Sequence, residues 1–355
     1  LYINGFGNRQ LFTSMYPSGS SINWTLPGNE YFIPIEGECG YRDNTSAWHK
    51  NKDLVRDVHK DLAYKIQKES QEIVLNFIKE WTEKTGIKKV CIAGGYGLNC
   101  VANYYFKKNL PNDIEIYCEP VSHDGGTSIG LAKLRWYEHT QSLEKFPLTT
   151  AYLGEKYNPE TYLNDIDTNL FDIQETSSKD VAELIANRNI VALYQGRAEA
   201  GPRALGNRSI LYDPRDPDGK DFVNIVKGRE WFRPFAGTVL KESAKDWFDM
   251  AGLEESPYMM YAVDVQADKI DKIPNITHVD GTCRIQTVTS EQNKHYYDLI
   301  LEFNKLTGVP ILFNTSFNLG GDALVETIDD AIDALVRSKM KYLYLPEIQK
   351  LIVKK

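Results

Sequence analysis

The sequence has few cysteines and no long apolar run. Its five cysteines are an odd number and none stands in C-x-x-C spacing, which argues against a disulfide framework and gives no sign of a zinc site. No stretch approaches the ~18 uninterrupted apolar residues that a membrane-spanning helix needs. We therefore expect a soluble protein of a reducing compartment, the cytoplasm, without contact to a membrane.

Excess positive charge and a secretory leader are also missing. The formal net charge is −8, which argues against a protein that grips nucleic acid mainly through its phosphates. The chain starts Leu-Tyr-Ile-Asn-Gly-Phe, with no basic stretch before an apolar core, so no signal peptide is expected. Arginine and lysine gather instead between residues 197 and 233. Such a local basic cluster in an acidic protein favours a small anionic ligand.

Periodicity divides the chain into two parts, as a length of 355 residues also favours. From Asp53 to about Gly86, apolar residues recur every three or four positions, which predicts a long amphipathic helix. Strands are expected at 89–95 and 114–118, each followed by a glycine-rich turn and a helix. This alternation predicts an α/β layer over residues 1–150.

Residues 151–355 predict an α+β domain with a mixed sheet. Its strands are expected at 190–194, 237–241, 259–265, 284–288 and 309–313, and its helices at 180–187, 218–227, 293–306 and 327–338.

The stretch that follows the strand at 190–194 is the most informative. Residues 195–210, predicted as a loop, hold three arginines and three glycines. Guanidinium groups match phosphate or carboxylate oxygens, and glycines let the backbone approach a ligand and donate N–H groups. The alternative is a solvated loop whose arginines pair with nearby aspartates. Residues 227–235 then interleave cations with aromatic rings, which suits either a nucleotide or the stacking of arginine on tryptophan.

Two shorter stretches complete this set. Arg284 follows a tight turn, and the strand at 309–313 ends in Asn314, Thr315 and Ser316, ahead of two glycines. Polar groups at a strand end are what a ligand pocket needs. Each of the four stretches is weak alone, but together in one domain they favour a phosphate-rich ligand such as a nucleotide.

The first part of the chain offers less specific candidates. Gly94, Gly95 and Asn99 follow a strand, which suits either a nucleotide or sugar pocket or a turn that lets strand and helix pack closely. Asp124, next to His123 and ahead of two glycines, suits either a metal ligand or a cap for the following helix. One carboxylate does not make a metal site.

Together these stretches resemble the O-carbamoyltransferase family, which includes nodulation-factor, cephalosporin and tobramycin-type carbamoyltransferases. The longest match is Gly196-Arg-Ala-Glu-Ala-Gly-Pro-Arg-Ala-Leu-Gly-Asn-Arg-Ser209. The other matching stretches are residues 93–103, 123–130, 152–154, 229–236, 280–284 and 310–318. The resemblance implies that residues 1–150 are the second half of an actin/Hsp70-like ATPase module and that residues 151–355 are a YrdC-like mixed-sheet domain.

The resemblance also implies a reaction and the residues that serve it. Carbamoyl phosphate and ATP, with Mg²⁺, would form carbamoyl-adenylate in the YrdC-like domain, and Fe(II) or a similar metal in the first module would help to pass the carbamoyl group to a substrate hydroxyl. The implied catalytic residues are Arg203, Lys227, Arg233 and Arg284. Those implied to bind carbamoyl phosphate or nucleotide are Arg197, Gly201, Asn314, Ser316, Gly94, Gly95 and Asn99, and the implied metal ligand is Asp124.

The sequence departs from the family in one respect. The family's other metal ligands lie in a histidine-rich element and an acidic loop of an N-terminal portion, and this sequence shows neither. A partner chain with the N-terminal half, or a portion outside this sequence, which has no initiator Met, is therefore expected. The alternatives are a threonylcarbamoyl-type tRNA-modification or hydrogenase-maturation protein, and a nucleotide-binding regulatory subunit. The acceptor stays open among sugars, antibiotics, lipochitooligosaccharides and nucleotides.

Overall fold

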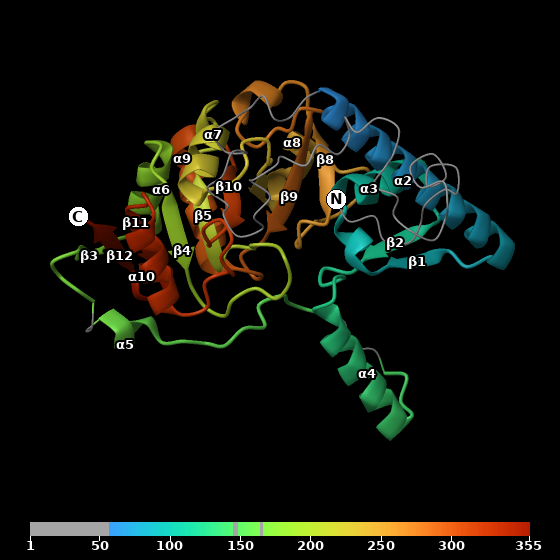
Figure 1. Ribbon diagram of the computed structural model, residues 1–355, viewed down its shortest axis with the longest axis horizontal. Coiled ribbons are helices and arrows are strands. Elements are labelled where there is room, and N and C mark those ends of the chain that lie inside the picture. The colour runs from blue at the N-terminus through green and yellow to red at the C-terminus, as the bar shows by residue number, and fades with distance from the viewer. Residues whose placement is uncertain (1–56, 145–147, 164–165) are drawn as a thin grey trace, which may run out of the picture. The chain divides into compact units, whose positions relative to one another are not determined.

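The fold was analysed in a computed structural model, which describes residues 57–144, 148–163 and 166–355. The chain divides into two units, residues 1–124 and 125–355, and each is described by itself. Figure 1 shows the elements of both units along the chain. The predicted start of the long helix at Asp53 lies outside the described residues.

The first unit is a small α/β layer. It consists of α2 (Asp57–Thr85), β1 (Lys89–Ile92), the 3-10 turn η3 (Gly95–Leu98), α3 (Cys100–Asn109) and β2 (Glu115–Cys118). The strands β1 and β2 are parallel, with Lys89 opposite Glu115. Leu75 and Ile78 of α2 pack with Ala102 and Phe106 of α3 in the core. The predicted long helix and the strand–turn–helix alternation are confirmed.

The second unit is built on one mixed sheet of ten strands, in the order β3-β12-β11-β4-β5-β10-β6-β9-β8-β7. The strands are β3 (Phe171–Glu175), β4 (Val191–Tyr194), β5 (Arg208–Tyr212), β6 (Ala236–Leu240), β7 (Phe248–Asp249), β8 (Tyr261–Val265), β9 (Thr282–Val288), β10 (Ile311–Ser316), β11 (Tyr342–Leu345) and β12 (Lys350–Lys354). Most neighbours are antiparallel, while β4–β11 and β6–β9 are parallel. The predicted mixed sheet is confirmed.

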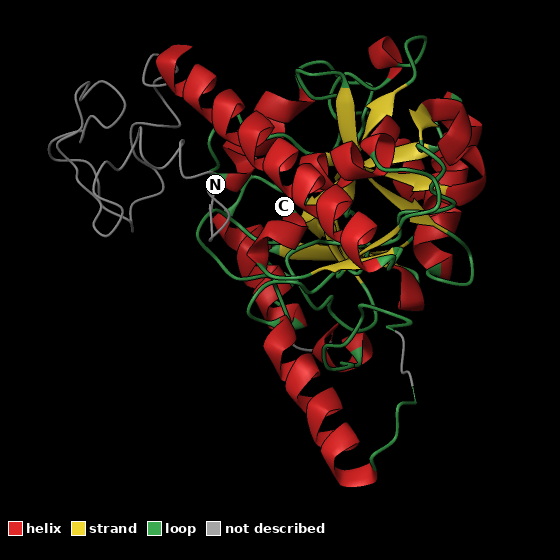
Figure 2. Ribbon diagram, turned by 90° about the vertical axis from the view of Figure 1, so that its right-hand side faces the viewer, coloured by secondary structure: helices red, strands yellow, loops and turns green. Residues whose placement is uncertain are grey.

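This unit also contains helices, and Figure 2 shows several of them beside the strands of its sheet, which are yellow. They are α4 (Gly126–Thr140), α5 (Pro159–Leu163), α6 (Ser178–Ala186), α7 (Gly219–Lys227), α8 (Ala244–Trp247), α9 (Lys294–Thr307) and α10 (Ile328–Arg337), with short 3-10 turns η4 (Lys241–Ser243), η5 (Ile270–Lys272) and η6 (Pro346–Ile348). The helices α6 and α9 lie side by side (Figure 1). Every residue of β4, β5 and β6 is buried, so the centre of the sheet is the core.

One prediction for this unit was wrong. Residues 208–210 were expected in a loop, but they open β5, in which Ser209 pairs with Leu193 of β4 and with Ser316 of β10. The arginine and serine gave this segment a polar pattern, yet both side chains are fully buried. The strands β3, β7, β11 and β12 were not predicted.

Within the part of the chain that the structure describes, no helix is both long enough and apolar enough to cross a membrane.

Candidate functional site

One face of the central sheet carries a row of polar side chains. Arg284 and Gln286 lie on β9, two residues apart, and therefore point to the same face. Ala236 of β6 pairs with Arg284 on one side and with Asn314 of β10 on the other. The same register places Thr238 of β6 opposite Gln286. Two strand ends predicted to bind a ligand are thus brought together, at one end of β6.

A loop after β4 covers this row, and Glu199 holds the loop in shape. The Glu199 side chain is buried, and its Oε1 accepts hydrogen bonds from the backbone N–H groups of Leu205 (2.8 Å), Asn207 (2.8 Å) and Arg208 (3.1 Å). One carboxylate oxygen therefore binds two N–H groups of the irregular loop and the first N–H group of β5, and so fixes how the loop enters the strand. Gly206, at φ +103°, packs against the ring of Tyr296, where a Cβ would lie 2.1 Å from a ring carbon.

Arg208 serves this loop and not a ligand. Its guanidinium is fully buried and donates to the carbonyl oxygens of Gln195 (2.6 Å), Gly196 (3.2 Å) and Glu326 (3.1 Å). It also stacks on the Tyr194 ring, 3.7 Å from the ring centroid. The suggestion that the arginines of this stretch meet an anion does not hold for Arg208, because its donors already bind main-chain carbonyls.

Lys227, the last residue of α7, is the most deeply buried cation of the predicted set. Lys227 is only 2% exposed, and its Nζ donates to the Ser316 carbonyl oxygen and to Asn318 Oδ1 (3.1 Å). Burial, with a smaller contribution from the Arg229 charge, holds the pKa of Lys227 well below its ordinary value. Among the described residues, no carboxylate pairs with this ammonium group. Lys227 is therefore placed where an anion would relieve an energetic cost.

More cations stand close by. Burial and the charges of Arg233 and Arg284 lower the pKa of Arg229 to about 10. Arg233 is half exposed and pairs with Glu230, with 3.1 Å between Nη2 and Oε1. Arg284 is more enclosed, and its Nε has no partner within the described residues. The structure therefore brings Lys227, Arg233 and Arg284 into one positive region, with Arg229 at its centre.

The other predicted residues of this unit lie around the same loop. Arg197 is exposed and donates to the Gly154 carbonyl oxygen at 3.1 Å. Arg203 is partly buried, and Gly201 adopts a φ of +96°. Ser316 Oγ donates to Asn318 Oδ1 at 2.6 Å. Arg197 thus has a structural contact, while Ser316 lies against Lys227.

The remaining candidates belong to the first unit. Gly94 has a φ of +85° at the turn after β1. Asn99 caps α3, because its Oδ1 accepts from the Ala102 N–H (3.1 Å), and its amide donates to Gln67 (3.0 Å). Asp124 lies at the end of this unit. No group of three or more His, Cys, Asp or Glu side chains suited to a metal occurs among the residues described. The described residues therefore do not fit a complete metal site.

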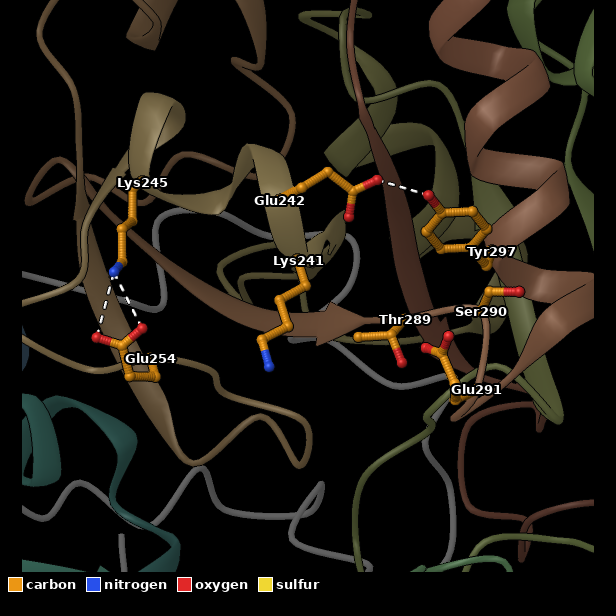
Figure 3. Close-up of a pocket in the computed structure, with 8 residues that line it drawn as sticks. All are labelled: Lys241, Glu242, Lys245, Glu254, Thr289, Ser290, Glu291 and Tyr297. Atoms are coloured by element: carbon orange, nitrogen blue, oxygen red, sulfur yellow. Dashed lines mark hydrogen bonds and ion pairs between the residues drawn. The ribbon is translucent and has the colours of Figure 1, made fainter.

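A cavity of about 480 Å³ lies at the far end of β6 and β9, after Leu240 and Val288 (Figure 3). Its lining carries more negative than positive side chains, with three glutamates against two lysines. Lys245 pairs with Glu254 at 3.1 Å, and the Tyr297 hydroxyl donates to Glu242 at 2.6 Å. With this excess of negative charge, the cavity is a poorer candidate for an anion than the region around Lys227.

Two family models match the chain. The model of the carbamoyltransferase N-terminus matches residues 42–133, and that of the carbamoyltransferase C-terminus matches residues 182–354. The chain belongs to the carbamoyltransferase family. The second match contains every cation of the positive region.

Curated relatives support this membership. The nodulation protein NolNO of Sinorhizobium fredii is 38% identical over 79% of this chain and 42% of that protein. NolO of Bradyrhizobium diazoefficiens is 37% identical over 79% of this chain and 53% of that protein. The uncharacterized protein MJ1058 of Methanocaldococcus jannaschii is 34% identical over 96% of this chain and 56% of that protein. The chain of this carbamoyltransferase-family member thus spans about half the length of the curated relatives it matches.

Solved structures give a distant likeness. Full-length HypF in its phosphate- and nucleotide-bound form has a TM-score of 0.34 at 16% identity, over 47% of this chain and 21% of that chain. A Sua5 from P. abyssi has a TM-score of 0.31 at 9% identity, over 47% of this chain and 52% of that chain. No conclusion rests on likenesses of this size.

The sequence analysis missed Glu199, Thr238, Gln286 and Arg229. Gln286 stands two residues after Arg284, which in a strand is the same-face spacing and was the available signal. Thr238 offered no local signal, because its partners lie on other strands. Glu199 is the one acidic residue in the arginine-rich stretch of residues 195–210, and a lone carboxylate among cations suggests a structural role.

We predict that Glu199→Ala destabilises the second unit by at least about 3 kcal/mol, because three buried N–H groups lose their acceptor at ~1–3 kcal/mol each. Urea unfolding followed by circular dichroism measures the change. Glu199→Gln keeps an acceptor oxygen and should cost less. Glu175→Ala, which removes an exposed partner of Lys350, is the control and should change stability by less than about 0.5 kcal/mol. Equal losses in the alanine variants at 199 and 175 would contradict the role of Glu199.

We also predict a pH dependence that belongs to Lys227. Because its folded-state pKa lies below 10.5, the unfolded chain binds more protons than the folded chain between these two pKa values. The free energy of unfolding therefore rises with pH across this interval, by up to about 1.4 kcal/mol per pH unit. Lys227→Met removes this slope, as unfolding between about pH 7 and 10 will show. Lys245→Met, at an exposed lysine, should keep it, and the same slope in both variants would refute the assignment.

Proposed function

We propose that this chain activates a carbamoyl group with ATP, as the C-terminal part of an O-carbamoyltransferase. Carbamoyl phosphate first loses its phosphate to water, which leaves carbamate. A carbamate oxygen then attacks the α-phosphorus of ATP, pyrophosphate leaves, and carbamoyl-adenylate forms. In the transfer step the hydroxyl oxygen of a small-molecule acceptor loses its proton and bonds to the carbamoyl carbon, while the bond between that carbon and the phosphate oxygen breaks and AMP leaves.

One observation carries the proposal. Lys227, Arg229, Arg233 and Arg284 stand close enough for their charges to act on one another, and burial and these neighbouring charges lower the pKa of Lys227 and Arg229. Arg233 pairs with the carboxylate of Glu230. A buried region with this excess of positive charge is unfavourable until an anion enters it. Carbamoyl phosphate and the ATP phosphates are anions of the required kind.

The roles proposed for the individual residues follow from this arrangement. Negative charge develops on the α-phosphate and on the departing pyrophosphate, and cations already in place offset it without reorganising. We assign this work to Arg203, Lys227, Arg233 and Arg284. Arg197, Gly201, Asn314 and Ser316 are proposed to hold carbamoyl phosphate and the nucleotide, with Mg²⁺ bound to the ATP phosphates.

The transfer half of the reaction is assigned to residues 1–150, as part of an actin/Hsp70-like module, and activation to residues 151–355, as a YrdC-like domain. Gly94, Gly95 and Asn99 would line the transfer site. Asp124 would contribute to a centre for Fe(II) or a similar metal, whose remaining ligands come from outside the described residues. No step is derived through this metal, because the residues described do not form its site. A partner chain is one source of the missing ligands.

The proposal predicts that the purified chain releases AMP and pyrophosphate from ATP when carbamoyl phosphate is present. Lys227→Ala should lower this release at least about a hundredfold, since a buried cation on a developing charge contributes ~3 kcal/mol or more. Lys245→Ala removes a lysine at the other end of the sheet (Figure 3) and should leave the rate unchanged. Release that does not depend on carbamoyl phosphate, or that survives Lys227→Ala, would overturn the proposed activity.

A further inference from the structure

A chain of hydrogen bonds links the Leu205 carbonyl group to the side chains of Gln286, Thr238 and Asn314. The main-chain carbonyl at its start fixes which atom donates in each of these bonds. Gln286 Nε2 donates to the Leu205 carbonyl oxygen at 2.9 Å. A carbonyl oxygen accepts only, so this contact decides which end of the Gln286 amide is the nitrogen. The amide oxygen then faces Thr238, whose hydroxyl lies 2.9 Å away and donates to it.

The same direction is imposed on Asn314. Having donated its one hydrogen to Gln286, the Thr238 hydroxyl offers only lone pairs, and Asn314 Nδ2 donates to it at 3.0 Å. Asn314 Nδ2 also donates to the Ala204 carbonyl oxygen at 3.1 Å. Both hydrogens of this amide are therefore in use, and the amide cannot turn over without opposing two acceptors.

Asn314 is left with a buried acceptor. The residue is 1% exposed, and Oδ1 has no hydrogen-bond partner among the described residues. Leaving such an oxygen unpaired costs free energy, so the site favours a ligand that brings an N–H group to it. Arg284, on the same face of the sheet, also has a buried unpartnered donor in Nε. The face therefore offers an acceptor and a donor to a small group that carries both N–H and oxygen.

We propose that Thr238 and Gln286 are positioning residues that hold the Asn314 amide with its oxygen toward the ligand, so that the site selects an acyl group bearing NH₂ over one bearing CH₃. This inference rests on the proposed function and deepens it, because carbamoyl and acetyl groups have similar shapes and differ in this hydrogen-bond donor. Oδ1 is enclosed, so a group bound to it is shielded from water. An acetyl group has no N–H to offer, so its binding would leave the buried Asn314 Oδ1 unpaired and would cost binding free energy.

Binding of two matched probes tests this inference. Calorimetry on the full chain compares carbamoyl phosphate with acetyl phosphate, and inorganic phosphate reports on the cations alone. The unmodified chain should bind carbamoyl phosphate at least about tenfold more tightly than acetyl phosphate, the difference expected for one buried hydrogen bond. Thr238→Val and Gln286→Met should lower this ratio about tenfold, because Asn314 is then free to turn. Affinity for inorganic phosphate should not change.

Thr238→Ser keeps the hydroxyl and is the conservative control, which should retain the full ratio. Damage to packing alone would weaken all three probes together and leave the ratio unchanged, and that result would overturn the inference. Equal binding of both acyl phosphates by the unmodified chain, or binding of neither, would overturn it too. A chain that shows the selective binding but releases no pyrophosphate from ATP would instead refute the proposed activity and leave the selectivity standing.

Discussion

The arrangement of this site depends on one buried carboxylate. Glu199 gathers main-chain N–H groups of Leu205 and Asn207 in the loop and of Arg208 at the start of β5, and the Arg208 side chain binds the carbonyl oxygens of Gln195 and Gly196, where the loop begins. Both buried charges thus have main-chain partners, which fix the loop, although Glu199 Oε2 has no hydrogen-bond partner among the described residues. The carbonyl groups of Ala204 and Leu205 then stand where Asn314 and Gln286 can bind them. If the loop had another shape, the side-chain amides of Asn314 and Gln286 would lose the carbonyl acceptors that fix their orientation.

A site of this kind sets function against stability. Lys227 would be more favourable in water, and its low folded-state pKa expresses the cost of burying its charge. Its contacts with Ser316 and Asn318 offer oxygen atoms but no negative charge. The protein bears this cost at the end of α7, where contact with Ser316 at the end of β10 holds the lysine in place. A bound anion would repay it, so ligand affinity and folding stability are linked at this residue.

The sequence revealed the periodic part of the fold and the positive part of the site, but not the polar part. The helix now assigned as α2 and most central strands were predictable, because their apolar spacing is independent of their partners. Arg208 was misplaced because a buried arginine in a strand has no local signature: its partners are carbonyl groups far along the chain. Thr238 and Gln286 act through bonds between strands, and a single sequence does not show strand order. Lys227 became a candidate because it stands in a cluster of cations, and Arg284 because it follows a tight turn in a stretch that resembles the family.

The two units differ in how complete their sheets are. The second unit has ten strands, and its central strands are paired on both sides. In the first unit, β1 and β2 pair only with one another within the described residues, and both carry exposed positions. Parallel strands are usually buried in larger sheets, because helices cover both faces. A catalytic centre at β1 and β2 therefore needs further strands from outside the described residues, whereas the positive region of the second unit has its full supporting sheet. This difference agrees with the proposed division, in which activation is assigned to residues 151–355 and transfer to the first unit together with what completes its sheet.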